Sequence, residues 1–440
     1  MRMETMKAEI RKELTDHIIP FWLSLKDEEN GGFYGFLSYE LKLDKKADKG
    51  CILNSRILWF FSHAYDFFRK EMLSENPDAS EDEILGREIF HGNSLYPACS
   101  VADLKNAATH AYRFLKEAML DLDNGGVYWS VTYEGIPSDT QKHTYNQAFA
   151  IYGLAAYYEI SGEKKALDTA YALMNIIEEK CSDKDGYLEA FTIDFKPRSN
   201  EELSENGVEA TRTMNSLLHC FECYTELYRV DKQEKVKEKL CEIANRFTEK
   251  FYNPEKTRQE VFFDSDYNSL IDLHSYGHDI ETSWLMEKGI QLIGDSGLTE
   301  KMTPMFRAME EHVYEAAFDG TALYNECENG VNDTKRIWWV ECEAVIGFLN
   351  RGMLEIRSAE GAALKDSSEE GGEMQNQYLL AAAKIWEYIR DHIVDPRPGS
   401  EWLSEVNTEN VPFTKKPIVE EWKCPYHNGR MCLEVLGTRV

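Results

Sequence analysis

Three histidines stand where a protein that moves protons would need them. His219 lies within an apolar stretch, and His278 and His427 each stand just before one. Histidine takes up and releases protons near neutral pH more readily than any other side chain. Two histidines on opposite walls of a pocket can act on the two faces of one carbon atom. The pattern therefore favours proton abstraction next to a carbonyl group and reprotonation from the other side, a reaction that requires no metal or nucleotide.

Each histidine also has a purely structural interpretation. His219 follows Asn215 by about one helical turn and can be a hydrogen-bonded core residue. His278, next to Gly277, can cap a helix, and His427 lies in a turn-forming run that can belong to a surface loop. The chemical interpretation gains weight only if all three histidines reach one pocket.

Aromatic, carboxylate and amide side chains near these histidines indicate a sugar as the substrate. Tryptophan faces stack on the apolar faces of sugar rings, while carboxylates and amides direct hydrogen bonds to hydroxyl groups. Arginine can stabilise the negative oxygen of an enolate. The candidate binding residues are Arg56, Tyr145, Asn215, Glu281, Trp284, Trp339, Glu343 and Trp422. Glu281 and Glu343 can alternatively be the acid and base of a glycoside hydrolase, or salt-bridged residues on helix surfaces.

Other chemical motifs are weak. Cys220 and Cys223 have the spacing of a redox or zinc pair, but they lie inside a helical pattern with no second pair nearby. The ten cysteines are therefore expected to be free thiols. His274 and His278 are four residues apart, yet Gly277 favours a helix that begins between them, so no metal site is predicted. The sequence has neither a Walker A nor a G-x-G-x-x-G motif.

Six repeats of one pattern position the candidate residues. Each repeat has an amphipathic helix, a turn with glycine or aspartate, a short aromatic β-prone stretch, a loop and a more apolar second helix. The first helices are expected at 6–25, 104–121, 166–179, 236–251, 305–317 and 378–393. The second helices are expected at 55–68, 146–159, 214–228, 279–292, 340–349 and 428–436.

A closed ring explains six repeats better than an open stack does. The last second helix contains MCLEVL at 431–436, which is too apolar for an exposed end, and closure packs it on the first repeat. The sequence therefore predicts an all-α (α/α)6 barrel, with second helices inside and first helices outside. We expect a single catalytic domain over residues 1–440, with polar insertions near 69–100 and 357–376, the latter solvated and mobile.

The directions of the helices determine where the candidate residues meet. In a ring of helix pairs, every second helix starts at the same end of the barrel. Equivalent positions at these starts are occupied by Arg56, Tyr145, Asn215, His278, Trp339 and His427. This geometry predicts one pocket that collects the histidines, tryptophans, glutamates and arginine.

Composition and charge narrow the classes of binding partner and the cellular location expected for the protein. The chain has 49 basic and 78 acidic residues, a net charge of −29, which disfavours nucleic acid and anionic membranes as partners. No apolar run reaches the roughly 20 residues of a membrane span, and the N-terminus lacks the apolar core of a secretion signal. We expect a cytoplasmic protein, with a monomer as its simplest state.

Eight segments of the chain resemble the N-acylglucosamine 2-epimerase superfamily, and together they extend over nearly its whole length. They are ELTDHIIPFW at 13–22, NGGFYG at 30–35, SRILW at 55–59, TY at 144–145, TMNSLLH at 213–219, HSYGHDIE at 274–281, WWVECE at 338–343 and WKCPYHNGR at 422–430. The set is specific, although no single segment is.

The resemblance implies an (α/α)6 barrel that needs no cofactor and acts on a small disaccharide. The implied reaction inverts C2 of the reducing-end glucose of β-1,4-linked disaccharides, converting cellobiose to glucosyl-mannose and lactose to epilactose. The implied route is ring opening, deprotonation at C2 to a cis-enediolate, rotation about the C2–C3 bond and reprotonation of the opposite face.

The resemblance also implies a role for each candidate residue. His278 and His427 would exchange the C2 proton, and His219 would assist ring opening or hold the substrate. The residues that would bind the sugar and stabilise the open chain are Arg56, Tyr145, Asn215, Glu281 and Glu343. Trp339 and Trp422 would stack on the sugar rings, and Trp284 would support the wall.

Three alternatives remain open at this point. An epimerase of N-acetylglucosamine would be expected to use a nucleotide effector. A glycoside hydrolase of the same barrel class would release glucose from cellobiose. A helical scaffold or sugar-binding module would have no catalytic activity.

Overall fold

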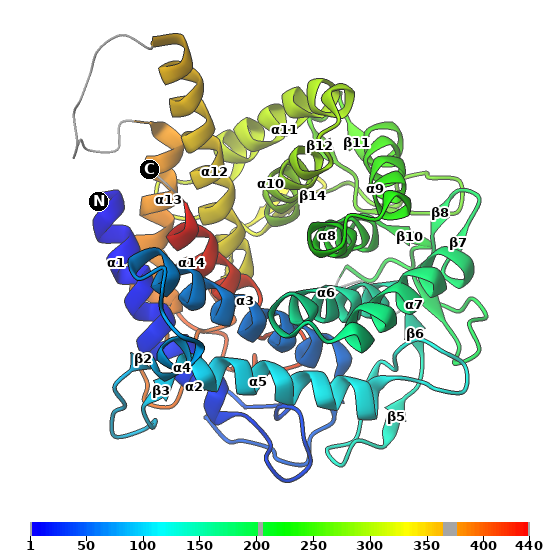
Figure 1. Ribbon diagram of the computed structural model, residues 1–440. Coiled ribbons are helices and arrows are strands. Elements are labelled where there is room, and N and C mark those ends of the chain that lie inside the picture. Colours follow the sequence, from blue (N-terminus) through cyan, green and yellow to red (C-terminus); the bar gives the residue numbers. More distant parts are fainter. Residues whose placement is uncertain (1, 201–205, 364–375, 439–440) are drawn as a thin grey trace.

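Six inner helices form a closed ring (Figure 1). The computed structural model describes residues 2–200, 206–363 and 376–438. The inner helices are α3 (Cys51–Glu75), α6 (Thr144–Ser161), α8 (Met214–Val230), α10 (Tyr276–Ile293), α12 (Trp338–Ala363) and α14 (His427–Gly437). Each contacts the next around the ring, and α14 also contacts α3. The predicted closure of the barrel is therefore confirmed.

The outer helices pack against this ring from outside. They are α1 (Met3–Glu13), α5 (Val101–Phe114), α7 (Lys164–Lys180), α9 (Glu234–Arg246), α11 (Ser296–Ala317) and α13 (Gln377–Tyr388). Short π-helical turns extend four of them: η1 (Leu14–Ile18), which leads into α2 (Ile19–Ser24), η2 (Leu115–Met119), η3 (Phe247–Phe251) and η4 (Ile389–Ile393). Each outer helix packs on the inner helix that precedes it in the chain, and α1 packs on α14.

The two kinds of helix differ in how their apolar residues are distributed. In α6 every position from Thr144 to Tyr157 is buried, as expected for a helix surrounded by protein. In α9 the buried residues are Val236, Leu240, Ile243 and Ala244, which follow the period of a single helical face. This difference is what places the second helix of each repeat inside.

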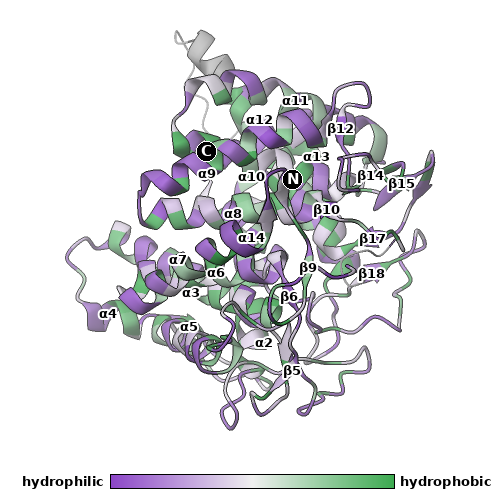
Figure 2. Cartoon of the chain, turned by 90° about the vertical axis from the view of Figure 1, so that its right-hand side faces the viewer, coloured by the Kyte–Doolittle hydropathy of each residue, from purple (hydrophilic) through white to green (hydrophobic). Residues whose placement is uncertain are grey.

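A belt of short antiparallel strand pairs joins neighbouring repeats where the inner helices begin. The strand just before an inner helix pairs with a strand of the next repeat. The pairs are β1 (Lys49–Gly50) with β4 (Ser130–Val131), β6 (Lys142–His143) with β9 (Ala190–Phe191), β10 (Arg212–Thr213) with β13 (Phe262–Phe263), β14 (Leu273–Ser275) with β15 (Glu326–Glu328), and β17 (Arg336–Ile337) with β18 (Glu405–Val406). A bridge between Leu37 and Val419 closes the belt. Figure 2 shows most of these strands along one side of the molecule.

The remaining strands are local. They are β2 (Glu88–Phe90) with β3 (Cys99–Ser100), β7 (Ser182–Asp183) with β8 (Gly186–Tyr187), β11 (Tyr252–Asn253) with β12 (Arg258–Gln259), β5 (Pro137–Asp139) beside β4, and β16 (Val331–Asp333) beside β15. They form hairpins or extend the belt.

A repeated ion pair ties the turn after an outer helix to the start of the next inner helix. The Lys49 Nζ atom lies 2.7 Å from Asp27, and the Lys142 Nζ atom lies 2.9 Å from Asp121, with all four side chains buried. Arg212 bonds Asp183 in the same way, at 2.6 Å. The aspartates also accept backbone N–H groups of their own turns. These three pairs tie their loops to the starts of the inner helices that follow.

The helix boundaries differ from the prediction mainly where polar residues continue a helix. The tract near 69–100, predicted as an insertion, begins as the last part of α3 and continues into α4 (Glu81–Gly86), β2 and β3. α12 runs to Ala363, well beyond the predicted end at 349. The core of the second predicted insertion, 364–375, lies outside the described residues. No helix in the described parts of the chain has the length and apolarity needed to cross a membrane.

Candidate active site

The N-terminal ends of the inner helices carry the predicted residues. His427 is the first residue of α14, Trp339 the second of α12 and His278 the third of α10. Tyr145 and Asn215 are the second residues of α6 and α8. The contacts described below bring residues of all six inner helices together.

His427 forms a carboxylate–histidine unit with Glu343. The Nδ1 atom of His427 lies 2.6 Å from Oε1 of Glu343, and both side chains are buried. Burial first, and then the charges of Arg430 and Arg56, hold the pKa of His427 well below its usual value. Burial raises the pKa of Glu343, although Arg430 opposes that change. The unit therefore acts as a base when Glu343 is ionised, and it can donate from Nε2 when Glu343 holds a proton.

His278 has a neutral partner instead. Its Nδ1 atom lies 2.7 Å from the Ser275 hydroxyl oxygen. Burial, together with the charge of His219, lowers the pKa of His278 to about 3, so the imidazole is neutral at physiological pH. With Nδ1 engaged by Ser275, Nε2 is the nitrogen left to meet a substrate.

One indole contacts both imidazoles. The ring centroid of Trp339 lies 4.7 Å from that of His278 and 5.5 Å from that of His427. Trp339 is partly exposed, whereas its neighbour Trp338 is buried and packs under Lys423. The adjacent tryptophans thus face different surroundings, and Trp339 is the one that contacts both histidines.

Gly277 leaves room for this indole. A Cβ atom at position 277 would lie 2.7 Å from Cη2 of Trp339 and 2.8 Å from a Val340 methyl group. Gly277→Ala is expected to displace Trp339 at a cost of about 1–3 kcal/mol, and to lower kcat/KM for a sugar substrate by about tenfold or more. Steady-state kinetics and thermal melting would measure both effects.

The matched control is Gly289→Ala in the same helix. A Cβ atom there would meet the Phe221 ring, about three turns further along α10. This variant should lose stability but keep its kcat/KM. Equal activity losses in the two variants would mean that Gly277 affects only the packing.

Arg430 connects four inner helices. One terminal nitrogen, Nη2, donates to Glu281 at 2.5 Å and to Glu343 at 2.7 Å. The other, Nη1, donates to Glu222 and to the Tyr426 hydroxyl, both at 2.5 Å. These residues belong to α8, α10 and α12, together with α14 and the residue before it. The cluster of Arg430, Glu222, Glu281, Glu343 and Tyr426 is called the Arg430 cluster below.

The carboxylates of the Arg430 cluster differ in charge. Burial, and then the charge of Glu343, raise the pKa of Glu281 to about 7. Burial also opposes ionisation of Glu222, but Arg430, His219 and Tyr426 outweigh it and lower its pKa to about 2. Near neutral pH Glu222 is ionised, whereas Glu281 binds a proton part of the time.

The same residues test the prediction of no metal. Ligand atoms of Glu281, Glu343 and His427 lie within 4.8 Å of one another, a donor set compatible with a metal ion. However, the Arg430 guanidinium already bonds both glutamates, so a second positive charge at this point would be repelled. His274, the other candidate ligand, bonds Asp279 at 2.8 Å and precedes α10, as the sequence predicted.

Arg56 lies beside Tyr426 of the Arg430 cluster. Its Nη2 atom donates to the Tyr145 hydroxyl at 2.8 Å, and Nη1 donates to the backbone carbonyl of Trp422 at 3.3 Å. The guanidinium carbon lies 4.1 Å from the centre of the Phe149 ring and 4.5 Å from that of Tyr426. The Nε atom of Arg56 is buried and has no hydrogen-bond partner among the described residues. The arginine is held rigidly by aromatic rings.

Three further predicted residues line or support this region. Trp422 is partly exposed and packs on Tyr145, with ring centroids 5.6 Å apart. Trp284 donates from its indole nitrogen to Glu343 at 3.0 Å, so it supports the cluster from behind. Asn215 is half-buried, and its buried Oδ1 atom has no hydrogen-bond partner in the described part of the chain.

His219 lies between Tyr145, which bonds Arg56, and the Arg430 cluster. Its ring centroid is 5.0 Å from that of Tyr145, and its Nδ1 atom is 2.8 Å from a Glu222 oxygen. Glu222 and Tyr426 are not among the residues that the sequence predicts for this site. The spacing of Glu222 three residues after His219 on one apolar helix was the available signal.

The cysteine pair plays no part in this region. Cys220 and Cys223 are buried free thiols within α8, and Cys223 donates to the Cys220 backbone carbonyl. Their spacing is that of two residues in one helix, as the sequence predicts.

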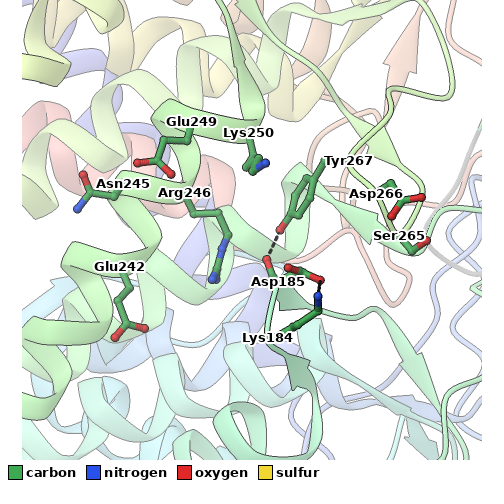
Figure 3. Close-up of a pocket in the computed structure, with 10 residues that line it drawn as sticks. All are labelled: Lys184, Asp185, Glu242, Asn245, Arg246, Glu249, Lys250, Ser265, Asp266 and Tyr267. Carbon is green, nitrogen blue, oxygen red and sulfur yellow. Dashed lines mark hydrogen bonds and ion pairs between the residues drawn. The ribbon is translucent and has the colours of Figure 1, made fainter.

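A separate surface hollow of about 580 Å³ lies between the β7–β8 hairpin, the end of α9 and the loop before β14 (Figure 3). Tyr267 points across it and donates to the Asp185 backbone carbonyl at 2.7 Å. Arg246, Lys250, Glu242 and Glu249 line it with mixed charge. None of the predicted site residues lies there, and the hollow contains no histidine.

Comparison with known proteins places this chain in a family. The family model of N-acylglucosamine 2-epimerase (GlcNAc 2-epimerase) matches residues 78–428. The chain belongs to this family. A cellobiose 2-epimerase of Ruminococcus albus is 44% identical over 435 residues, and one of Eubacterium cellulosolvens is 45% identical over 452 residues. Each comparison covers 99% of this chain and 99% of the relative.

Solved structures of the family have the same fold. A sugar epimerase from a ruminal bacterium has a TM-score of 0.84 at 43% identity, covering 99% of this chain and 100% of that one. The cellobiose 2-epimerase of Bacillus thermoamylovorans has a TM-score of 0.82 at 37% identity, covering 98% and 99%. A GH76 α-mannanase, 10% identical with a TM-score of 0.54, shares only the fold.

Proposed function

We propose that this protein is a cellobiose 2-epimerase. The observation that carries the proposal is the pair His278 and His427, which both contact Trp339 at the starts of inner helices, with His427 bonded to Glu343 of the buried Arg430 cluster. High similarity to several cellobiose 2-epimerases over the full chain supports the substrate class. The reaction inverts C2 of the reducing-end glucose, so cellobiose becomes glucosyl-mannose and lactose becomes epilactose.

The chemistry at C2 requires only the residues of this chain. After ring opening, one of the two histidines takes the C2 proton, which the aldehyde acidifies, and a cis-enediolate forms. Rotation about C2–C3 turns the other face toward the second histidine, which returns a proton to C2. Because the reverse reaction uses the same path, each histidine acts as acid in one direction and as base in the other. No electrons are gained or lost.

The remaining residues hold the sugar and balance its charge. The Arg56 guanidinium, fixed by Tyr145 and Phe149, supplies positive charge for the enediolate oxygens. Trp339 and Trp422 provide the partly exposed indole faces on which sugar rings stack. Asn215 offers a carbonyl oxygen that has no partner among the described residues, and Glu281 and Glu343 offer further hydrogen-bonding oxygens.

The contacts of Glu281 and Glu343 argue against a glycoside hydrolase. A glycosidase needs its two carboxyl groups on opposite sides of the scissile bond. Here both carboxylates converge on the same nitrogen of Arg430, and Glu343 also accepts from His427 and Trp284. Arg430 holds them as a pair on one side.

We also propose the domain organisation, location and partners of the enzyme. We place a single catalytic domain over residues 1–440, active as a cytoplasmic monomer on a free disaccharide, with no cofactor, nucleic acid or membrane as partner. The net charge of −29 supports the absence of polyanionic partners.

Incubation with cellobiose in D2O tests the function. We expect an epimer that carries one deuterium at C2 and is otherwise unchanged in mass, because the returning proton comes from solvent-exchanged histidine. Mass spectrometry and NMR would detect it. Release of glucose would indicate a hydrolase, an epimer without deuterium would indicate a hydride route, and activity on N-acetylglucosamine alone would favour the N-acylglucosamine epimerase.

A further inference from the structure

Glu401 is a fully buried carboxylate in the β-prone stretch of the sixth repeat. Its Oε2 atom accepts from the Lys423 Nζ atom and from the Trp402 backbone N–H, both at 2.8 Å. Its Oε1 atom accepts from the Trp22 indole nitrogen at 3.2 Å and from the side-chain amide of Asn428. Both oxygens of the carboxylate are therefore used within the protein.

Glu401 keeps its charge despite this burial. Burial opposes ionisation, but the charge of Lys423 and the hydrogen bonds from Lys423, Trp402 and Asn428 outweigh it, so the pKa of Glu401 lies below its usual value. Lys423 is buried as well, and its ammonium nitrogen lies 4.7 Å from the centre of the Trp338 ring. The two residues form a buried ion pair, in which removal of one charge destabilises the other.

The two side chains that Glu401 holds flank a segment without regular structure. Residues 421–426 form bends and turns before α14 begins at His427. Lys423 directly follows Trp422, and Asn428 directly follows His427. Because one carboxylate bonds both Lys423 and Asn428, it fixes the distance between the Trp422 indole and the His427 imidazole.

Other repeats connect the β-prone stretch to the inner helix in a different way. The fourth residue of the inner helix accepts a backbone N–H of that stretch. These pairs are Asn54 with Phe33, Gln147 with Val127 and Glu341 with Leu323. The fourth residue of α14 is Arg430, which belongs to the Arg430 cluster. In the sixth repeat the acceptor is therefore Glu401, in the β-prone stretch itself.

We propose that Glu401 is a positioning residue for proton transfer by His427 and for stacking of the sugar on Trp422. Because its oxygens are buried and bonded within the protein, it acts through Lys423 and Asn428 and not on the sugar. The inference rests on the proposed epimerase function.

Glu401→Gln should lower kcat for cellobiose epimerisation by about 10²-fold. Glutamine has one acceptor oxygen and an amide that only donates. The charge of Lys423 keeps the oxygen on its side, so the new amide faces the Asn428 amide and this hydrogen bond is lost. The start of α14, and His427 with it, then moves out of position. Steady-state kinetics would measure the loss.

Hydrogen exchange at C2 distinguishes positioning from a general loss of folded enzyme. The epimer that still exchanges in His427→Ala is the one served by His278. At saturating substrate in D2O, Glu401→Gln should exchange that epimer at close to the wild-type rate and the other epimer about 10²-fold more slowly. NMR would measure both rates, and a shortage of folded protein would slow both equally.

Two further variants test the two anchors one at a time. Asn428→Ala leaves the ion pair of Glu401 and Lys423 intact, so it serves if Glu401→Gln does not fold. It should show the same asymmetry between the epimers, with KM close to that of the wild type. Lys423→Met removes the anchor beside Trp422 and should raise KM by a larger factor than it lowers kcat.

Glu226→Gln is the matched control. Glu226 is a buried carboxylate that bonds His63 at 2.7 Å and Arg229 at 2.8 Å. It lies about three helical turns beyond Asn215 on α8, far from the start of that helix. This variant should lose stability but exchange both epimers in the wild-type ratio.

The outcomes are distinct. Equal slowing of both epimers in Glu401→Gln and Asn428→Ala would overturn the inference, since Glu401 would then serve only the fold. Wild-type kinetics in both variants would overturn it as well. If the wild-type protein exchanges C2 of neither epimer, the proposed function itself fails.

Discussion

Replacing His278 or His427 by alanine is expected to lower kcat for cellobiose epimerisation by about 10²–10⁴-fold. Each substitution removes one of the two groups that meet opposite faces of C2, so inversion cannot be completed. Stability should change little, because His278 is partly exposed and Glu343 keeps Arg430 and Trp284 as partners when His427 is lost. Steady-state kinetics and thermal melting would check both statements.

Single-histidine variants should still reveal which face each imidazole serves. The remaining histidine can remove and return a proton on its own face, so one epimer should exchange its C2 hydrogen with deuterium without inverting. The epimer that exchanges in His278→Ala should be the one that does not exchange in His427→Ala.

His63→Ala is the control for both variants. His63 also packs on an indole, 4.4 Å from Trp59, and also bonds a glutamate, but it lies outside the candidate site. The activity of the His63→Ala variant should match that of the wild type. A loss under about tenfold in either active-site variant would remove that histidine from proton transfer at C2.

Replacing Arg430 by methionine is expected to abolish activity and to lower the free energy of unfolding by about 3–5 kcal/mol. The arginine side chain is 1% exposed and is bonded to three buried carboxylates, which would keep no cation between them. Urea unfolding followed by circular dichroism would measure the loss.

The loss of stability in Arg430→Met should be larger at pH 8 than at pH 5. In the wild type, burial raises the pKa of Glu281 from 4.5 to about 7, so the folded state binds more protons than the unfolded state between these values. The free energy of unfolding therefore falls as pH rises through this window. Without Arg430 the pKa of Glu281 rises further and the window extends to higher pH.

Arg229→Met offers a matched comparison for this pH dependence. Arg229 also bonds two glutamates, Glu159 and Glu226, but its side chain is 30% exposed, so water replaces part of its charge. The Arg229→Met variant should lose less stability than Arg430→Met and should keep its activity. An Arg430→Met protein with the same deficit at both pH values would contradict the role given to the buried carboxylates.

The sequence alone determined the architecture of this protein. The inner helices are apolar on every face, as in α6, whereas outer helices such as α9 are apolar on one face, so the order of layers follows from local composition. Six such pairs with an apolar last helix imply closure. Closure with a common helix direction then brings residues such as Tyr145, His278 and His427 to one end without further information.

Only the tertiary structure decided the partners of these residues. Glu222 and Arg430 are 208 residues apart, and each looks like a polar residue interrupting an apolar helix. Glu343 and His427 are likewise far apart, by 84 residues, and nothing in the sequence pairs them. Whether such groups meet depends on the rotation of each helix about its axis, which is set by packing across the whole barrel. Burial inside the closed ring then shifts their pKa values, because the charges leave water only when all six repeats are in place.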